Sequence, residues 1–216
     1  SDGPSPRLVS AYGRFLERNG RAADAAALYG KIASNAALAP VIRDGQARIA
    51  KGDKPDALVK RPQDGVAEAL FGIAASLTEE QSTDVSILYL RLAIYLNPDL
   101  DLANVLLGDR METLQKYDEA IKAYRNIEKD SPYYRMAAIQ IATDEARLDK
   151  SDDAIRDLKA LAEAQPKDIE AWTALGDAYR AADKFPEAAG AYDHAADALG
   201  TPQKKDWPLF FARAIA

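Results

Sequence analysis

The sequence predicts an all-α protein, a right-handed α-solenoid in which antiparallel helix hairpins stack on one another. Ala is abundant and β-branched residues do not cluster, a composition that favours helices over strands. Apolar residues recur with the period of an amphipathic helix, and no segment shows the strict alternation of a strand. A third observation, one pattern repeated at a fixed interval, indicates that the helices form repeating units.

The interval between repeats is 34 residues. Pro98, Pro132 and Pro166 follow it, and each proline ends a unit because it cannot continue a helix. Four further positions keep the same register: Leu107, Ile141 and Leu175; Gly108, Ala142 and Gly176; Ala120, Ala154 and Ala188; Tyr124, Leu158 and Tyr192. A single hairpin cannot bury its apolar stripe alone, so we expect each one to stack against its neighbours.

The clearest unit lies between residues 169 and 202. One face of its first predicted helix carries Trp172, Leu175, Gly176 and Tyr179. A short turn at Asp183-Lys184 leads into a second helix that begins at Phe185 and places Ala188 on its inner side. The small residues at 176 and 188 leave room for the two helices to cross closely.

This pattern resembles the tetratricopeptide repeat, a helix–turn–helix unit. The matching residues are Trp172-x2-Leu175-Gly176-x2-Tyr179 followed by Ala188, Tyr192 and Pro202. The resemblance predicts these segments: 1–39, an N-terminal hairpin of this type; 40–66, a single helix and an irregular connection; 67–100, a degenerate repeat; 101–134, 135–168 and 169–202, three repeats; and 203–216, the first helix of a further repeat.

Three segments are similar to stretches of long, multi-repeat proteins of alphaproteobacteria. They are Ala11–Arg18, Leu92–Pro98 and Asp206–Arg213. Members of that group usually carry a signal peptide and further repeats on both sides, so we expect both ends of this chain to be cut. The resemblance implies a periplasmic or cell-envelope location; without it, the expectation is the cytoplasm. It brings no enzymatic activity.

Composition excludes several classes of function. The formal net charge is −6, from 28 Lys and Arg against 34 Asp and Glu, which argues against a nucleic acid partner. Cys is absent and His194 is the single histidine, so thiolate chemistry, imidazole metal sites and Ser-His-Asp triads are not expected. No apolar run is long enough to predict a membrane span. We predict no catalytic residue, no cofactor and no metal site.

The predicted function is that of a non-catalytic scaffold, which binds a protein, either as a peptide or as a partner helix, in the concave groove of the solenoid. The first helices of the repeats line such a groove, and their non-core positions are Val105, Asp109, Glu112, Met136, Ile139, Thr143, Arg147, Thr173, Asp177 and Arg180. The alternative for each position is an ordinary solvated surface. Chaperone-binding relatives use Lys, Asn and Arg to hold a C-terminal carboxylate, and Asp109, Thr143 and Asp177 stand at those positions here, so that ligand is not expected.

Two other classes of function stay open at this point. The repeats are either the docking arm of a larger enzyme or a structural spacer in a cell-envelope assembly. We also expect the helix at Trp207–Ala216 to dock on the second helix of the Trp172 repeat. Its remaining apolar side chains would then favour weak self-association.

Overall fold

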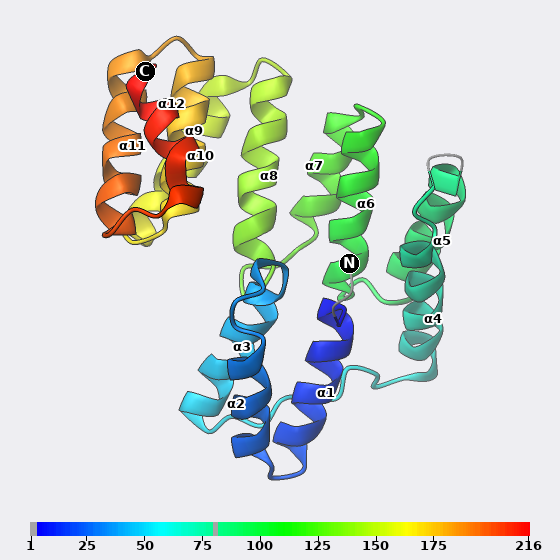
Figure 1. Cartoon of the computed structure of the whole chain (residues 1–216). Helices are drawn as coiled ribbons and strands as arrows, with labels where there is room; N and C mark the ends of the chain where they lie inside the picture. Colours follow the sequence, from blue (N-terminus) through cyan, green and yellow to red (C-terminus); the bar gives the residue numbers. More distant parts are fainter. Residues whose placement is uncertain (1–3, 80–81) are drawn as a thin grey trace. The chain divides into compact units, whose positions relative to one another are not determined.

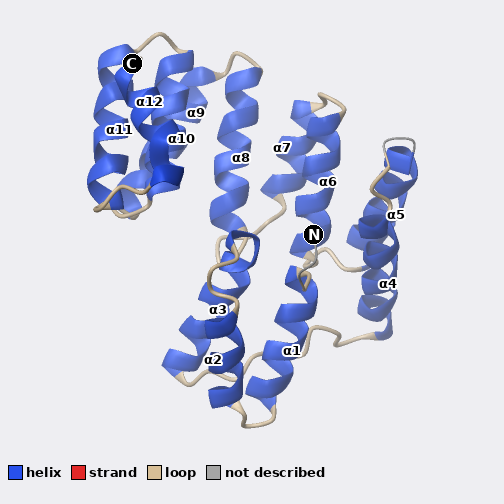
Figure 2. Cartoon of the chain, viewed as in Figure 1, coloured by secondary structure: helices blue, strands red, loops and turns tan. Residues whose placement is uncertain are grey.

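The structure is a computed structural model that describes residues 4–79 and 82–216. These residues form helices joined by loops and turns, and no strand occurs among them (Figure 2). The all-α prediction is therefore confirmed. The predicted segments 1–39 and 67–100 each include residues, 1–3 and 80–81, that lie outside the described part of the chain.

The helices follow one another along the chain as labelled in Figure 1. Their bounds are α1 Pro6–Arg18, α2 Ala22–Lys31, η1 Ala36–Leu38, α3 Ala39–Lys51, α4 Pro62–Ser76, α5 Thr83–Leu96, α6 Asp101–Thr113, α7 Tyr117–Arg125, α8 Tyr134–Arg147, α9 Ser151–Ala164, α10 Ile169–Ala181, α11 Phe185–Leu199, η3 Lys204–Asp206 and α12 Trp207–Ala214. Two compact units contain them. Unit 1 extends to Ala103 and includes Asp130–Tyr133, whereas unit 2 comprises Asn104–Lys129 and Tyr134–Ala216.

A small residue on the first helix of a hairpin stands 16 residues before a large residue on the second. Gly176 and Tyr192 illustrate it: a Cβ at position 176 would overlap the tyrosine ring. The same spacing gives Gly13 and Tyr29, Ala74 and Leu90, Gly108 and Tyr124, and Ala142 and Leu158. Glycine is paired with tyrosine and alanine with leucine, so the sum of the two volumes is roughly kept.

The turns between paired helices repeat as well. Gly20, Gln115, Asp149 and Asp183 all have a positive φ, between 55° and 75°, and each stands seven residues after the small residue of its hairpin. A basic residue follows each of them. The ammonium of Lys150 reaches Asp118 at 3.1 Å, and that of Lys184 reaches Asp152 at 3.0 Å. Consecutive hairpins of unit 2 are thus linked at the same point, although exposed pairs of this kind contribute little energy.

In unit 1, α3 completes a three-helix bundle with α1 and α2. The Tyr29 ring lies between Gly13 of α1 and Gly45 of α3, and a Cβ at either glycine would overlap it. The Tyr29 hydroxyl donates to Glu17 at 2.9 Å, and Arg48 of α3 donates to both oxygens of that carboxylate at 3.0 Å. The helix predicted over Val41–Ala50 is therefore part of a packed bundle.

The α4–α5 hairpin is the second element of unit 1. An ion pair between Arg7 and Glu68 connects α1 to α4. Residues 130–133 also belong to this unit, where Ser131 donates to Asp101 at 2.6 Å and the Tyr133 ring is buried.

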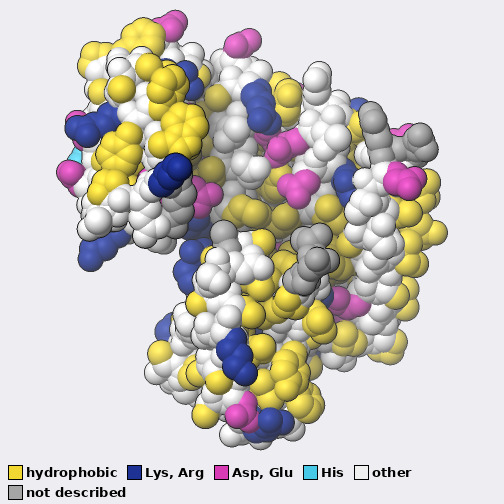
Figure 3. Space-filling view, in the orientation of Figure 1, with side chains coloured by type: hydrophobic (Ala, Val, Ile, Leu, Met, Phe, Trp, Pro, Cys, Tyr) yellow, Lys and Arg dark blue, Asp and Glu magenta, His cyan; other side chains and the backbone are white. Residues whose placement is uncertain are grey.

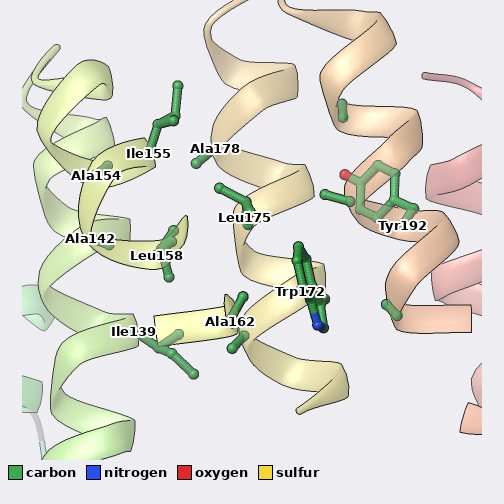
Figure 4. Close-up of a cluster of buried hydrophobic side chains, with 14 of the residues drawn as sticks. Ile139, Ala142, Ala154, Ile155, Leu158, Ala162, Trp172, Leu175, Ala178 and Tyr192 are labelled. Atoms are coloured by element: carbon green, nitrogen blue, oxygen red, sulfur yellow. The ribbon is translucent and has the colours of Figure 1, made fainter. Parts of the chain in front are cut away.

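The core of unit 2 is shared by α8, α9, α10, α11 and α12 (Figure 4). Its larger side chains are Ile139, Ile155, Leu158, Trp172, Leu175, Tyr192 and Leu209, with alanines between them. Leu209 comes from α12, which packs on α11 and adds an ion pair between Arg213 and Asp193. The predicted docking of the last helix on the second helix of the Trp172 repeat is confirmed.

The volume rule predicts how substitutions combine. Gly176→Ala should destabilise unit 2 by about 1–3 kcal/mol, because the added methyl group meets the Tyr192 ring. Combining it with Tyr192→Leu reproduces the natural pair of Ala142 and Leu158, so the double variant should lose less than the sum of the two single losses. Urea denaturation measures all three. Gly190→Ala is the control and should stabilise by about 0.5–1 kcal/mol, since its Cβ would meet no other atom. Strictly additive losses would contradict the rule.

Candidate interaction face

The first helices of the three repeats in unit 2 are connected side by side. Arg135 of α8 pairs with Asp168 and Glu170 at the start of α10, and Asp168 also caps that helix by accepting from the Ala171 amide at 3.0 Å. At its other end, α8 is tied to α6 by Arg147, whose Nη1 lies 3.8 Å from Glu112. We call the following side chains on these helices the first-helix face: Val105, Asp109, Glu112, Met136, Thr143, Arg147, Thr173, Asp177 and Arg180.

Ile139, the tenth residue predicted for this face, is not part of it. It is 7% exposed and belongs to the core of unit 2, three residues before Ala142 on the same side of α8. The prediction that it contacts a ligand is corrected accordingly. Thr143 and Thr173 stay on the face, each donating its hydroxyl to the carbonyl four residues earlier in its helix. Val105 and Met136 are half-buried.

Asp177 has a role that the sequence analysis did not assign. It accepts a hydrogen bond of 2.7 Å from the buried Tyr192 hydroxyl, while Arg180 lies 3.9 Å from it. Burial and this carboxylate raise the pKa of Tyr192 to about 12, so the phenol stays neutral and acts as the donor. The carboxylate itself remains exposed. One side chain therefore accepts from a buried hydroxyl while its carboxylate stays exposed to solvent.

Tyr124 serves two carboxylates instead of one. Its hydroxyl lies 2.8 Å from Asp109 Oδ1 and 2.7 Å from Glu112 Oε1. Burial, followed by the charge of Asp109, raises the pKa of Tyr124 far above its ordinary value. Asp109 and Glu112 were predicted as groove contacts from their register alone. The structure shows that both lie within hydrogen-bond distance of the packed tyrosine, whose single hydroxyl hydrogen one of them accepts at a time.

Two buried acids on α8 complete the polar network. Asp144 has no exposed surface and accepts from Arg147 at 3.1 Å, and the Arg147 guanidinium lies 5.1 Å from the centre of the Tyr117 ring. Burial and then the Glu112 charge raise the pKa of Asp144 to about 6. Glu145 is 3% exposed and pairs with Arg125 at 2.8 Å; burial raises its pKa too. Glu145 is not among the residues predicted for the site, and the signal that could have identified it is an acid within the apolar stripe of a repeat.

The remaining chemistry of the chain is sparse. His194 stacks on Trp172 with ring centroids 4.3 Å apart, which is a packing role. Within residues 4–79 and 82–216, no group of three or more His, Asp or Glu side chains is arranged to hold a metal ion. No described helix is both long enough and apolar enough to cross a membrane.

These features define an α-helical repeat protein of the solenoid class. Residues 139–201 match the tetratricopeptide repeat family model, so the family match falls within unit 2. No curated protein sequence is similar enough to count as a match.

Solved structures show the same fold at low sequence identity. MamA 41-end from Desulfovibrio magneticus RS-1 is 20% identical and has a TM-score of 0.54, over 69% of this chain and 84% of that one. A crystal structure of MamA is 17% identical with a TM-score of 0.54, over 87% and 94% of the two chains. YrrB, described as a TPR protein with an unusual peptide-binding site, is 15% identical with a TM-score of 0.53, over 73% and 78%.

The two tyrosines predict different costs for the same substitution. Tyr192→Phe removes one hydrogen bond to an exposed carboxylate, which water can replace, and should cost about 0.5–1.5 kcal/mol. Tyr124→Phe removes the donor that Asp109 and the largely buried Glu112 share, so it should cost more, about 1.5–3 kcal/mol. Urea denaturation at pH 7 compares them directly. Equal losses would mean that Glu112 gains nothing from the phenol.

Proposed function

We propose that the chain is a non-catalytic scaffold that binds a peptide or a partner helix along the first-helix face. The observation that carries the proposal is the row of first helices, in which Arg135 joins α8 to α10 and Arg147 joins α8 to α6. By register, apolar, hydroxyl and charged side chains of three repeats are expected on one face of this row. Helical repeat proteins use extended surfaces of this kind for protein partners.

The structural neighbour YrrB supports this choice, because its description names a peptide-binding site. At 15% identity the similarity to YrrB shows the fold alone, so binding by this chain has to be inferred from its own residues. Met136 and Val105 offer apolar contacts, Thr173 a hydroxyl, and Arg180 and Asp177 opposite charges. No observation on the described residues favours the docking arm of an enzyme or a structural spacer. A periplasmic or cell-envelope location stays a prediction of the family resemblance.

Two charge reversals, Arg180→Glu on the first-helix face and Lys159→Glu on α9 as its control, test the proposal together with Thr173→Arg. Peptides selected from a random displayed library against the intact chain are labelled, and their affinity is measured by fluorescence anisotropy. Arg180→Glu and Thr173→Arg should weaken binding at least about tenfold, roughly 1.4 kcal/mol. Lys159→Glu on α9 makes the same change of charge as Arg180→Glu, on an exposed side chain of a second helix, and should leave the affinity unchanged. A library that yields no binder, or equal losses for the two reversals, would contradict the proposal.

We propose in addition that α12 supports weak self-association. Trp207 and Phe211 are 62% and 57% exposed and share one face of α12, and Ile215, which is 52% exposed, follows at the same four-residue spacing directly after the helix. The space-filling view shows hydrophobic side chains gathered where α12 lies in Figure 1 (Figure 3). A second copy of the chain would cover such a patch.

Sedimentation velocity over a concentration series tests this association. Phe211→Ser should lower the fraction of dimer at high concentration, because it interrupts the middle of the stripe. Leu88→Ser on α5, where the leucine is 57% exposed, removes an equally exposed apolar side chain elsewhere and should leave the fraction unchanged. If Leu88→Ser alone abolishes association, the contact lies in unit 1 and α12 is not its site.

A further inference from the structure

Three carboxylates in unit 2 form a connected chain with two donors. The order is Asp109, the Tyr124 hydroxyl, Glu112, the Arg147 guanidinium and Asp144. We call Asp109, Glu112 and Asp144 the carboxylate chain. Each neighbouring pair of acids is bridged by a single donor group, so the acids are close enough to repel one another.

The donors do not match the acceptors in number. A phenol has one hydrogen, yet the Tyr124 oxygen lies at hydrogen-bond distance from both Asp109 Oδ1 and Glu112 Oε1. On the other side, one nitrogen, Arg147 Nη1, is 3.1 Å from Asp144 Oδ1 and 3.8 Å from Glu112 Oε2. A proton on any of the three acids would reduce the repulsion along the carboxylate chain, and on Asp109 or Glu112 it would also supply the donor missing at the Tyr124 hydroxyl.

Asp144 is the acid with the strongest need for that hydrogen. Its side chain is fully buried, and Oδ2 finds no hydrogen-bond donor among the described residues. A buried carboxylate oxygen without a donor is costly when charged, and protonation is the ordinary relief. Glu112 is 19% exposed at its side chain, whereas Asp144 has no exposed surface.

Titratable and charged groups lie on each of the helices packed near Asp144. They are Asp109, Arg110 and Glu112 from α6, Tyr117, Tyr124 and Arg125 from α7, Glu145 and Arg147 from α8 itself, and Asp153 and Asp157 from α9, which act on Glu145. On the α10 side, Asp168 and Glu170 are held by Arg135. Among the ion pairs of Asp144, the cation is Arg147, and its guanidinium also lies near Glu112.

We propose that the carboxylate chain binds one proton at mildly acidic pH, with Asp144 as its principal site, and that unit 2 thereby responds to pH. The proton removes one negative charge beside Glu112 and Arg147, both on the first-helix face. The proposal does not rest on what that face binds, because a proton is the only ligand involved.

The pKa of Asp144 is raised into the mildly acidic range, as the proposal requires. Burial and then Glu112 raise it from an ordinary value near 4 to about 6. The folded state therefore holds the proton more tightly than the unfolded state does. The stability from this group is fully present below about pH 4 and falls as the pH rises through 6. Asp168, whose pKa is lowered by Arg135 in spite of burial, contributes in the opposite sense and only at more acidic pH.

The next repeat provides an internal control. Asp177 accepts from the Tyr192 hydroxyl of its own hairpin, and its ion pair is with Arg180 at 3.9 Å. The phenol there has one acceptor and no second carboxylate shares it. Asp177→Asn therefore removes a carboxylate from the same kind of site without touching the carboxylate chain.

The first measurement is a titration of the side-chain carboxyl ¹³C shift of Asp144 by NMR on the whole chain. We expect a midpoint near pH 6, and Glu112→Gln should move the midpoint down, because it removes the repelling charge. A midpoint of Asp144 below about pH 4.5 would overturn the proposal. This readout needs only the native protein and one variant outside the fully buried position.

The second measurement compares melting temperatures, followed by circular dichroism, between pH 5 and pH 7.5. Asp144→Asn should remove the part of the pH dependence that belongs to Asp144 and should melt above the wild type at pH 7.5. Asp177→Asn should keep the wild-type dependence. An unchanged dependence in Asp144→Asn contradicts the proposal. If that variant does not fold, the carboxyl titration with Glu112→Gln decides the question.

Discussion

The close crossing of the two helices in each hairpin depends on one steric relation, a small residue facing a large one 16 positions later. Where the small residue is glycine, a tyrosine ring occupies the space that a Cβ would fill. Where it is alanine, the partner is leucine, as at Ala142 and Leu158. Because protein interiors are close-packed, neither member can change size alone without strain or a cavity. The apolar face that stacks on the next hairpin is formed only when this crossing is in place.

Much of this arrangement could be predicted from the sequence. The 34-residue columns contain the small and large residues, so helix pairs, turns and core positions such as Leu175 and Tyr192 follow from spacing alone. The position of Ile139 could not, because its two repeat equivalents on the first-helix face, Val105 and Thr173, share its register and only packing separates core from surface. The shared use of Tyr29 by Gly13 and Gly45 also escaped prediction, since Gly45 lies outside the regular columns.

The sequence predicted where the acids of the candidate site stand, but it did not predict which hydrogen bonds they accept. Register places Asp109 and Asp177 on the first-helix face, but periodicity contains no information on which donor an acid accepts from. The buried Asp144 shows the same limit from the other side. Its burial depends on packing between α8 and its neighbours, and that burial, followed by the charge of Glu112 32 residues earlier in the chain, raises its pKa. Electrostatic coupling between acids on different helices cannot be predicted from the periodicity of a sequence.

The pair of residues packed inside each hairpin, Gly–Tyr or Ala–Leu, also determines whether an acid on the first helix accepts a hydrogen bond from it. A buried tyrosine brings a hydroxyl that needs an acceptor, and the carboxylate appears one residue after the glycine, at Asp109 and Asp177, or four residues after it, at Glu17 and Glu112. Leucine brings no such need, and Thr143 stands where the equivalent acid would be. The negative charge of the first-helix face therefore follows the distribution of Gly–Tyr and Ala–Leu pairs. A partner that recognises this face would distinguish repeats by their core packing, through the acids that the tyrosines require.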